Sequence, residues 1–320
     1  MNRYLLLFAL IVGCKGQPEK PWEYLGQSTP GTTPEMFAPA NVSTGNNERD
    51  FAISPDGTEI YYSLVGVQKS VIVMRKYSGG RWEDPAIASF SGNSYDIEPA
   101  FSPDGSKLYF ASRRSLTDSG PDKDFDIWYV EKQKDGSWSE AKNMGAPVNS
   151  DGHEYYPSVA KSGNLYFTLR LEEGGMGGED IVFSKFENGK FTAPEPLDST
   201  VNSSTDEYNA FVDPDEQFII FGSWQREGSQ GGGDLYISRK DAAGKWQPAV
   251  NMGDAINSPR LDYCPYVSPD GQWLFFTSEK VKSSDQTEGS LTYEGFVGQI
   301  SSPGNGRGDI YWVRMPVAEK

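Results

Sequence analysis

Short apolar runs and turn sequences alternate along the chain in a pattern that occurs five times. Each copy has two apolar runs separated by a turn, which reads Ser-Pro-Asp-Gly at residues 54–57, 102–105 and 268–271. Looser copies of the turn stand at residues 160–163 and 213–216. Proline presets φ at the second position of a type I turn and glycine suits the fourth, so the pattern predicts β-hairpins.

Each repeat contains four strand-like segments. The second segments are continuous apolar runs, typical of strands that are covered on both faces; they lie at residues 60–63, 108–111, 165–168, 218–221 and 274–277. The third segment begins with an aspartate in four repeats, namely Asp126, Asp180, Asp234 and Asp309. In the first repeat the third segment comprises residues 71–74 and has no such aspartate. We expect the four aspartates to cap turns by accepting from backbone N–H groups. The fourth segment follows a Gly-x-aromatic step and ends in a Val/Ile-Asn-Ser echo at residues 148–150, 201–203 and 256–258.

The spacing of the repeats predicts the architecture. Four periods span the 214 residues from Ser54 to Ser268, about 53 residues each, which suits a blade of four antiparallel strands in a β-propeller. The last repeat lacks its fourth strand, and residues 36–43 are expected to supply it from the N-terminal end. This predicts an all-β fold, a single propeller of five blades closed by an N-terminal strand. The alternative, six blades, needs about 50 more residues than the chain has.

The Ser-Pro-Asp-Gly hairpins followed by Asp-Ile-Tyr strands resemble the TolB-like, WD-repeat-like propeller repeats of bacterial envelope proteins. The resemblance covers roughly residues 35–315 and implies protein partners without saying which.

The N-terminal residues have the pattern of a secretion signal. A short basic start precedes an apolar run at residues 4–12, too short for a transmembrane helix, and Cys14 follows it as in the bacterial lipobox. We therefore expect a signal peptide at residues 1–13, lipidation of Cys14, a tether at residues 14–34 and the propeller at residues 35–320. Lys15, rather than Asp, follows the cysteine, which favours the outer membrane, with the protein facing the periplasm or the cell surface.

Charge and composition narrow the function classes. The chain has 29 basic and 45 acidic residues, and loss of the signal leaves 28 against 45, a net charge of −17. Nucleic acid is therefore not an expected partner. Cys264 is the one cysteine after Cys14, so no intramolecular disulfide is expected, and it should be a buried small hydrophobe. Because His153 is the single histidine, a zinc site of the Cys/His kind is not expected. No other metal and no cofactor is predicted, and we expect a monomer.

Strand direction separates two faces of the predicted ring. The loop face carries the starts of the first strands and the long glycine-rich loops between second and third strands, and the turn face carries the Ser-Pro-Asp-Gly turns. Six residues before each turn stands an acid that should line the mouth of the central channel on the loop face: Glu48, Asp96, Glu154, Glu207 and Asp262. Two interpretations of these five acids remain open: they bind a ligand, or they pair with the backbone of a neighbouring blade or with arginines of the protein. Side chains that are not repeated share this face and complete the predicted ligand site: Arg113, His153, Arg170 and Trp224.

Two functions fit these residues. The first is a non-catalytic, lipid-anchored module that binds or scaffolds envelope proteins. The second is a propeller that binds or cleaves glycans with carboxylates and arginines, as glycosidases do. No Gly-x-Ser-x-Gly sequence is present, and a single histidine disfavours a Ser-His-Asp site, so catalysis is the less favoured reading. Asp122, Asp124 and Asp126 alternate as in calcium loops, but the glycine and distal glutamate of that motif are missing, so a solvated loop is expected.

Overall fold

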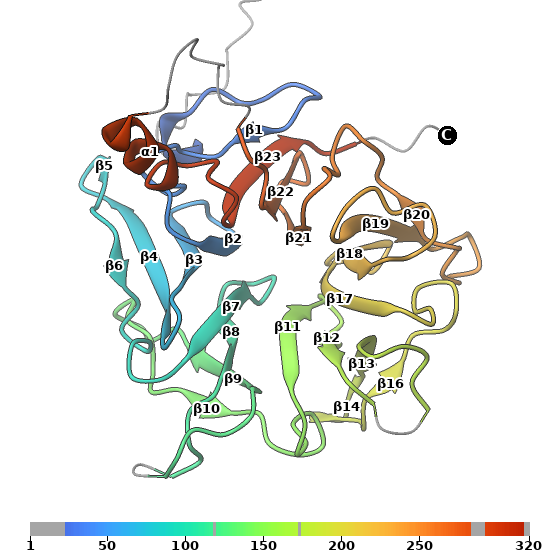
Figure 1. The fold of residues 1–320 in the computed structure, drawn as a ribbon. Coiled ribbons are helices and arrows are strands. Elements are labelled where there is room, and N and C mark those ends of the chain that lie inside the picture. Colours follow the sequence, from blue (N-terminus) through green and yellow to red (C-terminus); the bar gives the residue numbers. More distant parts are fainter. Residues whose placement is uncertain (1–22, 118–119, 172–173, 283–291, 317–320) are drawn as a thin grey trace, which may run out of the picture.

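The computed structural model describes residues 23–117, 120–171, 174–282 and 292–316. Five sheets surround a central axis as the blades of a propeller (Figure 1). The first strand of each blade is innermost, and these strands contact one another in order around the ring. The predicted all-β fold with five four-stranded blades is confirmed.

Each blade is one sheet, and its strands follow one another in chain order from the axis outwards, except that β1 (Glu35–Met36) supplies the outer strand of the last blade. The first strands are β2 (Glu48–Ile53), β7 (Asp96–Phe101), β11 (Glu154–Val159), β17 (Asp206–Val212) and β21 (Asp262–Val267). The second strands are β3 (Glu59–Val65), β8 (Lys107–Ser112), β12 (Leu165–Leu169), β18 (Phe218–Trp224) and β22 (Trp273–Ser278). The third strands are β4 (Ser70–Ser78), β9 (Asp126–Glu131), β13 (Asp180–Ser184), β19 (Asp234–Arg239) and β23 (Asp309–Arg314).

The outer strands are short. They are β6 (Ala86–Ile87), β10 (Lys142–Asn143), β16 (Glu195–Pro196), β20 (Val250–Asn251) and β1 (Glu35–Met36), with additional pairs at β5 (Arg81–Trp82), β14 (Phe186–Glu187) and β15 (Lys190–Phe191). The core is made of apolar clusters between consecutive blades. Tyr61 and Ile72 of blade 1, for example, pack with Leu108 and Phe110 of blade 2, which is why the second strands are apolar on both faces.

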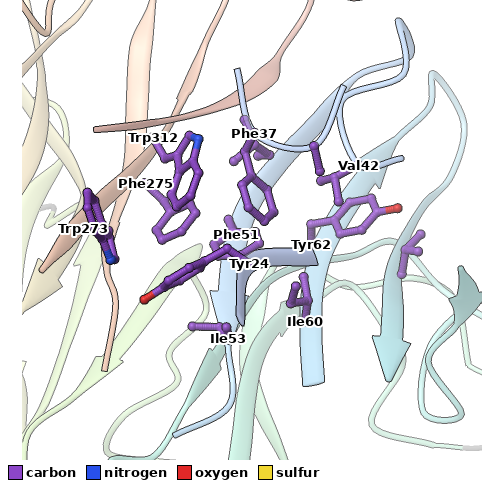
Figure 2. Packing of buried hydrophobic residues seen from close by; sticks show 13 residues of the cluster. Tyr24, Phe37, Val42, Phe51, Ile53, Ile60, Tyr62, Trp273, Phe275 and Trp312 are labelled. Atoms are coloured by element: carbon purple, nitrogen blue, oxygen red, sulfur yellow. The ribbon is translucent and has the colours of Figure 1, made fainter. Parts of the chain in front are cut away.

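The N-terminal segment closes the ring, as predicted. β1 pairs antiparallel with β23, with Met36 opposite Tyr311. The paired strand is shorter than the predicted residues 36–43, because after Phe37 donates to the Ile310 carbonyl the chain turns. Ser43 then returns to bond both backbone groups of Ile310. Figure 2 shows the core of this closure, in which Phe37 packs edge-on against Phe51 of blade 1 and Trp312 of blade 5.

Part of the expected tether packs on the propeller. Residues Glu23–Gly26 form a single tight turn, η1, in which Tyr24 and Leu25 have left-handed backbone angles. The Tyr24 side chain is only 5% exposed and lies 5.2 Å from the ring of Trp312. The Tyr24 hydroxyl donates to Asp270 in the last Ser-Pro-Asp-Gly turn. Segment 23–34 therefore contributes to the closure of the ring.

Every first strand contains a bulge at the same position. The register shifts between Arg49 and Ala52, and equivalent shifts occur in the other four blades. At each bulge one non-glycine residue has φ between 50° and 63°, a left-handed conformation that such residues seldom adopt. These residues are Asp50, Glu98, Tyr156, Asn209 and Cys264. The bulges direct five side chains, two positions after the repeated acids, towards one another.

Within the described ranges, one α-helix interrupts the β-structure. α1 (Tyr293–Ile300) lies in the long loop of blade 5, and Thr292 caps it by accepting from the Gly295 N–H. Its apolar side chains are exposed. No helix in the described parts of the chain is long and apolar enough to span a membrane.

Candidate functional site

The five repeated acids of the loop face are buried, and each accepts hydrogen bonds from the segment just before it. Glu154 accepts from the Ser150 N–H at 3.1 Å and from its hydroxyl at 2.5 Å. Glu207 and Asp262 accept the same pair of bonds from Ser203 and Ser258. Thr44 donates both bonds to Glu48, and the Ser91 hydroxyl and Gly92 N–H donate to Asp96.

The Asn-Ser pair that recurs at residues 149–150, 202–203 and 257–258 explains this arrangement. The Asn149 side chain accepts from the Ile127 N–H at 2.9 Å and donates to the Ile127 carbonyl at 3.0 Å. Asn202 and Asn257 clamp Ile181 and Leu235 in the same way. The serine that follows each asparagine then binds the acid of the next blade. The carboxylates therefore join the end of one blade to the start of the next.

The burial of these carboxyl groups changes their titration. Burial raises the pKa of Glu154 to about 7, and the bonds from Ser150 oppose that shift. Burial also raises the pKa of Glu48, Glu207 and Asp262 above the usual range. Arg114 pairs with Asp96 at 2.7 Å and Arg226 with Glu207 at 3.5 Å.

The other predicted ligand residues are exposed on the loops of the same face. His153 accepts from the Phe125 N–H through Nδ1 and stacks on Tyr155. Arg113 donates to the Lys123 carbonyl, and Trp224, at the end of β18, is 42% exposed. Arg170 lies near Glu179. Burial raises the pKa of Glu179, and the charge of Arg170 opposes that shift. These side chains stand around the buried acids, and their role in ligand binding stays a prediction.

The aspartates at the start of the third strands mostly cap turns, as expected. Asp180 accepts from the Met176 N–H, Asp234 from Gln230 and Gly231, and Asp309 from Gly304. Asp126 instead takes its bonds from the Lys123 ammonium and the Asn143 amide. Among the described residues, no group of three or more His, Cys, Asp or Glu side chains is arranged to hold a metal ion.

The bulge residues form a polar cluster at the centre of the channel. The Arg49 guanidinium donates to Asp50 at 2.6 Å and to Glu98 at 2.9 Å. The Cys264 thiol donates to Asp50 at 2.8 Å. The cysteine is buried as predicted, and burial raises the pKa of its thiol well above the ordinary value.

Glu98 is the residue of this cluster with most internal donors. Besides Arg49, the Asn209 amide donates to Oε1 at 3.2 Å and the Tyr156 N–H donates to Oε2 at 2.7 Å. In three other blades the N–H of the bulge residue donates to a Ser or Thr hydroxyl on the second strand of the preceding blade. These bonds run from Asp50 to Thr277, from Glu98 to Ser63 and from Asn209 to Thr168. Blade 2 has Ala111 at that position, so the N–H of Tyr156 bonds to Glu98.

A cavity of about 730 Å³ opens on the turn face, below this cluster. Glu98 and Tyr156 line its inner end. Its walls come from all five first strands and include Phe51, Ala100, Val159, Phe211 and Tyr266. Charged side chains also line it, namely Lys161, Arg239 and Arg314 against Asp213, Asp215 and Asp270.

The ligand site predicted from the sequence lies on the loop face, and this cavity was not predicted. A signal was present, since positions three to five residues after each repeated acid are largely apolar or proline and belong to the strands that surround the axis. A smaller hollow of about 380 Å³ lies beside blade 1, where Glu48, Tyr62 and Arg75 line it.

Comparisons with known proteins concern the fold. No family model and no curated protein matches the chain. Solved structures do match, among them a glycoside hydrolase, 10% identical with a TM-score of 0.53, where the match covers 91% of this chain and 96% of that one. TolB from Agrobacterium tumefaciens is 15% identical with a TM-score of 0.48, over 85% and 91% of the two chains.

TolB from Acinetobacter baumannii also matches, at 16% identity and a TM-score of 0.45, over 85% of this chain and 58% of that one. At such identities a match speaks for fold and says nothing about activity. The chain is a five-blade β-propeller. Each of its five sequence repeats forms one blade, as the resemblance to TolB-like propeller repeats implied.

Proposed function

We propose that this chain is a non-catalytic, lipid-anchored propeller of the bacterial cell envelope that binds a segment of a protein partner in the turn-face cavity. The observation that carries the proposal is the cavity itself. It lies on the axis, has about 730 Å³ of space and is walled by phenylalanine, tyrosine, valine and proline side chains. Concave apolar sites with a few convergent polar groups are the usual form of binding sites.

Its polar groups favour binding over catalysis. Glu98, the carboxylate at the inner end, accepts from Arg49, Asn209 and the Tyr156 N–H. These donors fix the carboxylate in place and fill three of its roughly four acceptor sites, which suits it to hold a ligand. The acids of the loop face are likewise engaged by Ser and Thr donors, which supports a structural role for them.

A crosslinking experiment tests the proposal. A photoreactive amino acid at Phe211, in the cavity wall, should crosslink one defined partner in envelope preparations. Ala100→Trp should abolish the crosslink by filling the cavity, whereas Ala243→Trp, at an exposed position outside the lining, should leave it intact. Equal crosslinking in both variants would rule the cavity out as the binding site.

A second candidate is glycan binding on the loop face. The observation that favours it is Trp224, a half-exposed indole on the same face as Arg113, Arg170 and Arg226, since aromatic faces and arginines are common in polar ligand sites. A glycan array with Trp224→Ala, and a glycoside panel with Glu154→Gln as control, test it. No binding and no turnover would remove this candidate.

A further inference from the structure

Two buried carboxylates face one guanidinium at the inner end of the cavity. Asp50 and Glu98 are 1% and 3% exposed and share Arg49. The second oxygen of Asp50, Oδ2, has no hydrogen-bond partner among the described residues. When both carboxyl groups are ionised, the cluster carries two negative charges against one positive charge in a place where water cannot compensate them, a costly arrangement that a cationic ligand would relieve.

Glu98 connects this cluster to the cavity. Its carboxylate is bonded to Arg49, and the residue also lines the cavity together with Tyr156. A group that enters from the turn face thus passes the charged mouth and then the apolar walls before it reaches Glu98. This order matches a side chain with an aliphatic stem and a cationic head.

The charged side chains at the mouth balance, since Lys161, Arg239 and Arg314 stand with Asp213, Asp215 and Asp270, so they do not exclude such a group. Lys161 is paired with Asp215 at 2.8 Å. The guanidinium of Arg239 lies 5.5 Å from the Phe218 ring. The acidic Asp213 and Asp270 are in the lining as well. The whole chain has a net charge of −16, so basic partners are attracted at long range.

We propose that the cavity receives a lysine or arginine side chain of the protein partner, its aliphatic part against Phe101, Phe211 and Tyr266 and its cationic head at Glu98. This inference rests on the proposed function and specifies its ligand. An acidic or purely apolar segment would offer no cation to the Glu98 carboxyl group.

The titration of Glu98 supplies an independent readout. Burial, and next the charge of Asp50, raises the pKa of Glu98 to about 8, while Arg49 and the Tyr156 N–H oppose the shift. The other titratable groups around it are Glu179, Tyr155, Tyr156 and Cys264. A cation that binds the ionised form releases a proton, so its affinity should rise about tenfold per pH unit up to pH 8 and then level off.

Two small probes separate the cation from the stem. N-acetyl-lysine N-methylamide has an ammonium group, and N-acetyl-norleucine N-methylamide has the same aliphatic chain without it. In NMR titrations of the full chain at pH 8, the lysine probe should bind about tenfold more tightly, as expected for a charge-assisted hydrogen bond. In Glu98→Gln, checked for folding by circular dichroism, the two affinities should become equal. Ala100→Trp should weaken both.

The outcomes distinguish this inference from the proposed function. Equal affinities in the unaltered protein, or a lysine preference that persists in folded Glu98→Gln, overturn the lysine or arginine assignment while leaving the cavity as a protein-binding site. Affinity for neither probe also overturns it, and an unaltered Phe211 crosslink in Ala100→Trp overturns the proposed function itself. If Glu98→Gln does not fold, the pH dependence in the unaltered protein decides. A lysine preference that does not change between pH 6 and pH 8 contradicts the assignment.

Discussion

At the scale of single residues, the repeated polar side chains mainly hold blades together, and two departures from the repeat account for two unpaired carboxylate oxygens. Asn143 and Asn251, each six residues before a clamping asparagine, donate to Asp126 and Asp234. Pro196 and Phe37 stand at the equivalent positions of the other two junctions. As a result, one carboxylate oxygen each of Asp180 and Asp309 has no partner among the described residues.

Glu154 should make the protein less stable as pH rises. Its pKa of about 7 in the folded state lies above the ordinary value of 4.5. The folded state therefore binds more protons between these values, and the free energy of unfolding falls as pH rises from about 4.5 to 7. In Glu154→Gln the amide oxygen can still accept from Ser150, but the charge is gone. We expect the variant to match the unaltered protein at pH 5 and to exceed it by about 1–2 kcal/mol at pH 8, in urea unfolding.

Glu154→Ala is the control, since it removes the acceptor as well. It should lose about 1–3 kcal/mol at both pH values, because the Ser150 donors remain buried. An equal pH dependence in all three proteins would contradict the assigned titration.

Asn257 should contribute to stability through its two bonds to Leu235. Asn257→Ala leaves a buried N–H and a buried carbonyl unpaired, at a cost of about 2–4 kcal/mol. Asn257→Ser should recover part of the loss, because Ser43 bonds both backbone groups of Ile310 with one hydroxyl. Thermal unfolding measures the order, and a serine variant no better than alanine would refute this comparison.

At the scale of elements, the N-terminal segment completes a blade that the C-terminal end leaves one strand short. β1 supplies the outer strand of blade 5, and Tyr24 and Phe37 add their rings to the aromatic cluster at the junction of blades 5 and 1 (Figure 2). Because these contacts join residues far apart in sequence, they are expected to be lost together when the ring opens.

Phe37→Ala should therefore destabilise the whole propeller. Truncating a fully buried phenylalanine costs about 3–5 kcal/mol. Phe186→Ala, at an exposed phenylalanine in a peripheral hairpin, is the matched control and should cost under about 1 kcal/mol. Limited proteolysis and urea unfolding would show this contrast, and similar stabilities of the two variants would contradict a closing role for the segment.

The blade count and the closure were predictable because both depend on spacing. The turns return at a regular interval, and Ser43 stands five residues before Glu48 in the way that Asn149 stands before Glu154. The apolar and proline positions after each repeated acid indicate the cavity wall, but the central cluster was not predictable. It depends on a bulge in each first strand, which turns Asp50, Glu98 and Cys264 towards the axis, and on Ala111, which leaves the Tyr156 N–H to Glu98. The bulges have no signature in the order of apolar and polar residues.

At the scale of the whole molecule, the predicted lipid anchor and the ring closure lie close together in the chain. Cys14 is nine residues before Glu23, where the described structure begins with η1 on blade 5. An extended chain covers about 3.4 Å per residue, so the anchor would keep this side of the propeller within about 30 Å of a bilayer. The cavity would then be offered to partners near the membrane surface.

The anchor itself is tested by Cys14→Ser. Loss of the thioether should move the protein from the membrane fraction to the soluble fraction, because the acyl chains on Cys14 are the predicted attachment to the bilayer. Cys264→Ser changes the other cysteine in the same way and should leave the protein in the membrane fraction, since that thiol is buried at the centre of the ring. Fractionation with immunodetection measures both. Membrane retention of Cys14→Ser would contradict the lipobox prediction and would point to another means of attachment.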